Sequence, residues 1–216
     1  MKLKSRPQNR TNEPDAVRAS RRKAAARPDK ALEFLRTWGL LMLQDSSFPS
    51  LVALIAGGAA QGSWWSHSKG SEIFHTAGAL ADHPDVMTTK LISGKVTFIH
   101  RQLWPALMAM GQAREPWQLV GLTAAARSLL ERVDHEGQVR ASGVPARQLE
   151  KKLLVASSEV HTESGAHAVE LMTWPVFAEH RRSGLPRIPI TAAREKLDAL
   201  LVEMNGKFGG NGMLPW

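Results

Sequence analysis

The chain has 216 residues, of which 43% are hydrophobic, a size that supports one or two domains with a substantial core. It has no cysteine, which excludes disulfides and thiolate metal sites, and its longest apolar run, residues 51–60, is too short to span a membrane. The formal net charge is +8. We therefore expect a soluble, cytoplasmic protein that does not enter membranes and has a negatively charged partner.

The positive charge is concentrated at the start of the chain. Residues 1–30 hold ten basic and three acidic residues and so carry +7, whereas the rest of the chain carries +1. Few large apolar residues occur here, which predicts a disordered basic arm over residues 1–28. We expect Arg21, Arg22 and Lys23 to bind nucleic-acid phosphates, because each neutralised phosphate releases a counterion. The alternatives are an anionic membrane or protein partner, or a solubilising tail with no specific partner.

Apolar periodicity predicts three helices in the first part of the body. Residues 30–44 carry a broad apolar stripe with Asp29 as the N-cap, and Ser50 caps a nearly all-apolar helix over residues 51–60. The third helix is expected over residues 71–81. Its predicted inward side chains are Ile73, Phe74, Ala77 and Leu80.

A polar, aromatic loop over residues 62–70 separates the second and third helices. The adjacent Trp64 and Trp65 cannot both point into one core from a helix, so one ring can pack while the other stacks on a nucleobase. His67 and Lys69 would then meet phosphate. The alternative is that both indoles close the end of the core.

Two β-prone runs, residues 86–92 and 95–100, are joined by Ser93-Gly94 and predict a hairpin with a two-residue turn. That register places one apolar face on the core: Met87, Leu91, Val96 and Phe98. It makes the other face solvated and basic: Thr88, Lys90, Lys95 and Thr97. Lys90 and Lys95 are therefore candidate phosphate contacts.

The second half repeats the pattern of helices followed by a hairpin. Helices are predicted over residues 103–110, 117–133 and 146–153, and a short strand over residues 137–140. The third of these helices carries three candidate nucleic-acid contacts: Arg147, Lys151 and Lys152. A second hairpin, turning at Ser164-Gly165, is predicted to pair residues 154–163 with residues 166–172. A final helix is expected over residues 191–204.

The second hairpin carries the residues best suited to catalysis. Side chains alternate along a strand, so Glu159, His161 and Glu163 share one face, and a two-residue turn adds Glu170 to it and excludes His167. A histidine beside carboxylates suits general acid–base catalysis, which makes Glu159, His161 and Glu163 the candidate catalytic residues. The alternative is an exposed polar face. The spacing matches no established metal-ligand motif, so no metal site is predicted, and no cofactor is identified.

Together these elements predict an α+β, mostly helical fold with two β-hairpins. The order of helix, helix and hairpin appears in residues 29–116 and again in residues 117–216, as in tandem winged-helix-like units, although one such unit or another α+β arrangement also fits. In a winged helix, the helix before the hairpin enters the major groove and the hairpin contacts the backbone. We therefore expect a DNA-binding protein; the alternative is a nucleic-acid-processing enzyme of the glycosylase or nuclease type, as in DNA repair.

Overall fold

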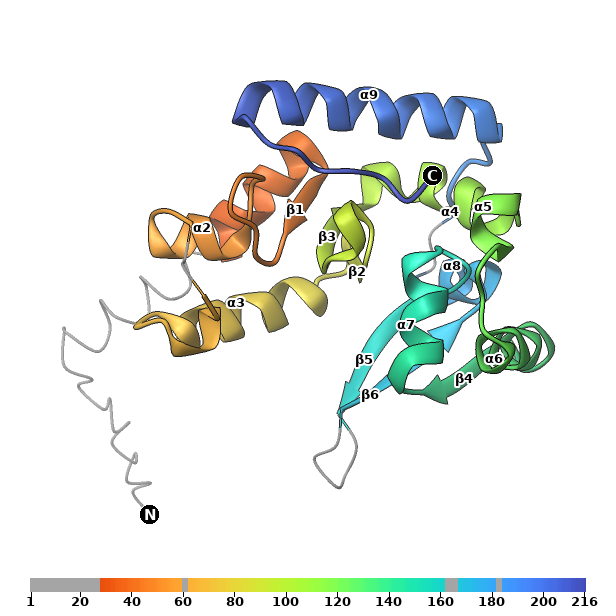
Figure 1. The fold of residues 1–216 in the computed structure, drawn as a ribbon. Coiled ribbons are helices and arrows are strands. Elements are labelled where there is room, and N and C mark those ends of the chain that lie inside the picture. The colour runs from red at the N-terminus through yellow and green to blue at the C-terminus, as the bar shows by residue number, and fades with distance from the viewer. Residues whose placement is uncertain (1–27, 60–61, 162–166, 182–183) are drawn as a thin grey trace, which may run out of the picture.

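The computed structural model describes residues 28–59, 62–161, 167–181 and 184–216. Within these residues the chain has the α+β, mostly helical fold that the sequence predicts, with two antiparallel three-stranded sheets (Figure 1). None of the helices in this part of the chain is long and apolar enough to cross a bilayer.

The first predicted helix ends earlier than expected. Residues 28–38 are helical, so Asp29 lies inside the helix rather than at its cap. Gly39 has a φ of +77°, which glycine adopts without a steric penalty, and the chain then enters strand β1, Leu40–Met42. The predicted extension of this helix to residue 44 is wrong, because a short apolar run has the same pattern in a buried helix and a buried strand.

The next two helices agree more closely with the sequence. Helix α2, Leu51–Ala56, begins after Ser50, whose side chain accepts the Ala53 N–H as an N-cap. It ends four residues before the predicted boundary. Helix α3, Gly70–Ala81, buries Ile73 and Leu80 as expected. Phe74, however, is 44% exposed, so its predicted inward orientation is wrong.

The first hairpin has a different register from the predicted one. Strands β2, Val86–Thr89, and β3, Thr97–His100, pair with Thr89 opposite Thr97 and Thr88 opposite Phe98. The register is shifted because the connection is longer than a two-residue turn and contains a 3-10 helix, Ile92–Gly94. Strand β1 pairs with the other edge of β3, which gives the order β1-β3-β2.

Apolar side chains cover both faces of this first sheet. Met87 and Ile99 join one buried cluster, whereas Val86 and Phe98 join another that includes α2 and α3. The predicted common face for Met87 and Phe98 is therefore wrong. The predicted solvated face is also wrong, because Thr97 is fully buried. This hairpin is an internal part of the fold and does not project as a wing.

The second half of the chain contains the remaining elements. The helices are α4 (Trp104–Gln112), α5 (Pro116–Leu119), α6 (Ala124–Glu136), α7 (Gly143–Lys151), α8 (Trp174–His180) and α9 (Ile190–Phe208). The strands are β4 (Gln138–Ala141), β5 (Ala156–His161) and β6 (His167–Met172). They form a sheet of order β4-β6-β5, with α6 and α7 beside it (Figure 1).

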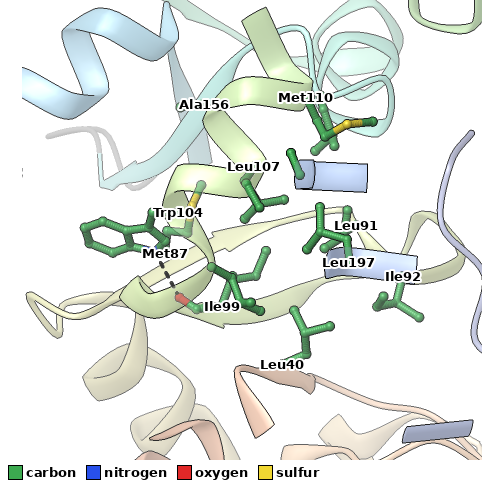
Figure 2. Close-up of a cluster of buried hydrophobic side chains, with 14 of the residues drawn as sticks. Leu40, Met87, Leu91, Ile92, Ile99, Trp104, Leu107, Met110, Ala156 and Leu197 are labelled. Atoms are coloured by element: carbon green, nitrogen blue, oxygen red, sulfur yellow. Dashed lines mark hydrogen bonds between the residues drawn. The ribbon is translucent and has the colours of Figure 1, made fainter. Parts of the chain in front are cut away.

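One core cluster joins the two halves. Leu40 and Ile99 of the first sheet meet Leu107 of α4, Ala156 of β5 and Leu197 of α9 (Figure 2). The indole N–H of Trp104 donates to the carbonyl oxygen of Ile99 at 3.2 Å. This cluster spans the domain boundary predicted between residues 116 and 117.

Residues after α9 fold back along the molecule (Figure 1). The Asn205 amide bonds both the N–H and the carbonyl oxygen of Gly212, at 2.8 and 2.9 Å. The Ser93 N–H donates to the Met213 carbonyl oxygen at 2.7 Å, and the Met213 N–H donates to Ser93 Oγ at 3.2 Å. Residues 209–213 thus connect α9 to the loop between β2 and β3.

Candidate nucleic-acid interface

Helix α7 presents a basic edge away from the core. Ala146 and Leu149 are buried in a cluster with α6 and the second sheet. Val144, Arg147 and Lys151 follow the three- and four-residue spacing of one helical face, and all three are exposed. The result is a helix with an apolar inner edge and an outer edge that carries two positive charges.

Contacts on both sides fix the position of α7. The Thr123 hydroxyl, which caps α6, donates to Gln148 of α7 at 2.8 Å. On the other side, the buried Glu150 carboxylate accepts from Lys90 Nζ at 2.5 Å and from Ser157 Oγ at 2.9 Å. These bonds hold α7 against α6, the first sheet and β5.

The other candidate lysines outside the arm are engaged within the protein. Lys90 pairs with Glu150, and Lys95 Nζ lies 2.8 Å from an Asp45 carboxylate oxygen. Lys152 Nζ donates to the Trp117 carbonyl oxygen at 2.6 Å. Lys151, by contrast, is exposed and forms no ion pair with any residue that the structure describes. Arg21, Arg22 and Lys23 lie outside the described residues.

The tryptophan loop buries one indole and exposes the other. Trp64, in the 3-10 helix Trp64–Ser66, is 9% exposed, whereas Trp65 is 64% exposed. Their rings stack with centroids 4.0 Å apart and planes at 24°. His67 Nδ1 accepts the Lys69 N–H, and Lys69 Nζ donates to the Ile55 carbonyl oxygen at 2.7 Å, near the end of α2. His67 therefore stabilises the loop itself, and Lys69 attaches the loop to the end of α2.

The second hairpin also differs from the predicted register by one residue. His161 pairs with His167 and Ser158 pairs with Glu170, because an odd number of residues separates the strands. Glu170 is therefore not the cross-strand partner of Glu159. Its Oε1 atom lies 3.7 Å from Nε of Arg140 in β4. The prediction that Glu170 shares the strand face of His161, and that His167 does not, is therefore wrong.

The acid–base cluster itself stays a prediction. Glu163 lies outside the described residues, and for Glu159 and His161 the structure gives only their places in β5. In the described part of the chain, no group of three or more histidine and acidic side chains is arranged to hold a metal ion.

Two features of these surfaces were not found from the sequence. The first is Phe74, whose ring centroid lies 5.4 Å from that of Trp65 and which extends the exposed aromatic surface. Helical periodicity placed it inside because Phe74 follows the buried Ile73 directly. The second is Val144, whose exposure on the outer edge of α7 depends on the packing of Ala146 against α6.

The outer edge of α7 and the exposed face of Trp65 are thus the two candidate surfaces. Comparisons with protein families, with curated proteins and with solved structures found no match to this chain.

Proposed function

We propose that the protein binds double-stranded DNA through its basic arm and the outer edge of α7. The observation that supports this most directly is the exposed pair Arg147 and Lys151 on a helix that immediately precedes a β-hairpin. In winged-helix proteins the helix at this position enters the major groove. Here α7 likewise precedes the hairpin of β5 and β6, although strand β4 lies between α6 and α7 in the chain, and Thr123 and Gln148 join the two helices.

The arm and helix α7 would contribute to DNA binding in different ways. Residues 1–30 carry +7 and would supply affinity that does not depend on base sequence. The carboxylate of α7, Glu150, is buried and paired with Lys90, so it does not oppose an approaching phosphate. Val144, on the same edge as Arg147, could contact a thymine methyl group in the groove.

Charge removal at each surface tests the proposal. We expect Arg147→Gln/Lys151→Gln to weaken duplex binding and to reduce the slope of log K against log salt by about 1 to 2. Arg21→Gln/Arg22→Gln/Lys23→Gln should reduce the slope by up to about 3. Fluorescence anisotropy of a labelled duplex, titrated over a salt series, measures both quantities.

A charge-matched control removes two cations elsewhere. Arg187 and Lys196 are exposed, and Lys196 lies on α9, away from α7 (Figure 1). Arg187→Gln/Lys196→Gln should therefore change duplex affinity much less than the α7 variant does. An α7 variant that behaves like this control, or a duplex affinity that does not respond to salt, would contradict the proposal.

A further inference from the structure

Trp65 is an exposed indole on a loop that is held in place by its own hydrogen bonds. The Ser66 N–H and hydroxyl both reach the Ser63 carbonyl oxygen, at 3.2 and 2.8 Å. The His67 N–H donates to the Trp64 carbonyl oxygen, and the Gly70 N–H donates to that of His67. These polar groups are used inside the loop, so the main surface that the loop offers to a ligand is the aromatic ring.

The ring is supported from inside the protein. Trp64 is buried in a cluster with Ile55 of α2 and Ile73 of α3, and Trp65 stacks on it at 4.0 Å. Phe74 lies beside Trp65 with its ring tilted by 41°. We call Trp65 and Phe74, which are 64% and 44% exposed, the aromatic platform. Its orientation is set before any ligand arrives, which lowers the entropic loss on binding.

The helix that follows the basic arm in sequence packs in the same cluster as Trp64. Residues 28–38 continue the chain from the arm, and their buried side chains Ala31, Leu32 and Leu35 lie in the same cluster as Trp64. Lys30, at the start of that helix, lines a cavity of about 170 Å³ together with Leu54 of α2. The residues that carry most of the positive charge therefore directly precede the helix that packs in the cluster of Trp64.

We propose that the aromatic platform stacks on an unpaired nucleobase, so that the preferred ligand is nucleic acid with a single-stranded segment. This inference rests on the proposed nucleic-acid binding and narrows its substrate class. A paired base in a duplex has both faces covered by its neighbours, whereas an unpaired base can place one face on Trp65. The Ser66 hydroxyl and the Lys69 ammonium are already bonded within the protein, so contact by stacking should tolerate any of the bases.

Substitution of Trp65 tests the platform in the full-length protein. We expect Trp65→Ala to weaken binding of a labelled oligothymidylate of about 16 nucleotides by roughly 10-fold or more, and binding of a duplex of equal length by less than about twofold. Trp65→Phe should retain part of the affinity. Val202→Ala is the matched control, because Val202 is 72% exposed on α9 and lies on another element.

A spectroscopic measurement reports contact at this ring directly. Oligothymidylate should quench the tryptophan fluorescence of the wild type more than that of Trp65→Phe. Unchanged single-strand affinity in Trp65→Ala, or equal losses for single strand and duplex, would overturn the platform while leaving duplex binding intact. A change in sedimentation of Trp65→Ala without a change in oligonucleotide affinity would make the platform a protein contact and also overturn it. A wild-type protein that binds neither oligonucleotide would refute both proposals.

Discussion

Asp45 is a mostly buried carboxylate whose charge is stabilised by close donors. Burial by itself would raise its pKa, but hydrogen bonds from Lys95 Nζ and from the N–H groups of Ser47 and Phe48 outweigh it and lower the pKa to about 2. The folded pKa is thus below the unfolded value of 3.8, so the ionised Asp45 stabilises the fold above pH 3.8. That contribution is lost as the pH falls from 3.8 toward 2.

Asp45→Asn should show this dependence. A shift of this size corresponds to about 2 kcal/mol of unfolding free energy at neutral pH. We expect the variant to lose roughly that amount at pH 7, and the difference from the wild type to shrink as the pH falls below about 4. Urea denaturation followed by circular dichroism across this pH range is the measurement. A difference that stays constant down to about pH 2 would exclude the ionised carboxylate as its source.

Lys90 and Glu150 form a second pair, in which both partners are largely withdrawn from water. Their side chains are 21% and 5% exposed. Lys90→Met leaves the buried Glu150 carboxylate with the Ser157 hydroxyl as its remaining donor. We expect the unfolding free energy measured by urea denaturation to fall by about 3 to 5 kcal/mol. The double variant Lys90→Met/Glu150→Gln removes the unpaired charge and should recover most of it.

An exposed pair provides the comparison for Lys90. Arg132 and Glu136 of α6 are 57% and 47% exposed, so Arg132→Met should lower the unfolding free energy by less than about 1 kcal/mol. Equal effects of Arg132→Met and Lys90→Met would mean that burial does not set the strength of the Lys90 pair.

These pairs also explain why the basic surface was only partly predictable. The sequence predicts that Lys90 and Lys95 lie on either side of a turn, but their partners Glu150 and Asp45 are distant in the chain, and no local pattern links them. Trp64 and Trp65 could be assigned to a loop, and their different exposure follows from the fact that adjacent side chains point in different directions. Which indole would be buried depended on the packing of α2 and α3.

At the scale of elements, α4 and α8 approach so closely that one position between them has no room for a side chain. A Cβ added to Gly111 of α4 would lie 2.0 Å from Trp174 Nε1. Trp174 is 2% exposed, and its Nε1 donates to the Leu153 carbonyl oxygen at 2.8 Å. A methyl group at residue 111 must therefore displace the ring and weaken this hydrogen bond.

Gly111→Ala should lower the unfolding free energy by roughly 2 to 5 kcal/mol, because it combines overpacking with a buried donor that loses its partner. Gly78→Ala is a matched control inside α3, where an added Cβ meets nothing within 4 Å. It should raise the unfolding free energy by about 0.5 to 1 kcal/mol, since alanine favours helix. Thermal melting distinguishes these opposite signs, and a stabilised Gly111→Ala would disprove the close packing.

Helices with long apolar stripes and clear caps were predictable, whereas strand details were not. Ser50 predicted the start of α2, and the stripe of α9 predicted most of Ile190–Phe208. The single helix predicted over residues 117–133 is wrong, because the chain forms α5 and α6 there with a break over residues 120–123. Strand β1 was missed because three apolar residues carry no period of their own. Both hairpin registers were shifted by one residue because the sequence does not fix connection length, and a one-residue shift exchanges the two faces.

For the whole molecule, the two surfaces proposed for nucleic acid lie on different parts of one connected body. The edge of α7 belongs to the second half, and the aromatic platform belongs to the first. Lys90 and Glu150 bond across these parts, and Leu197 of α9 packs in the cluster that draws on both sheets (Figure 2). A duplex with a single-stranded extension contains one segment of the kind proposed for each of these two surfaces.

The contacts of α9 and of residues 209–213 have a consequence for synthesis on the ribosome. Leu40, Met87 and Ile99 emerge early, yet their cluster needs Leu197, and the loop at Ser93 needs Met213. Part of the apolar surface of the amino-terminal sheet therefore stays uncovered until Leu197 and Met213 have been synthesised and have left the ribosome.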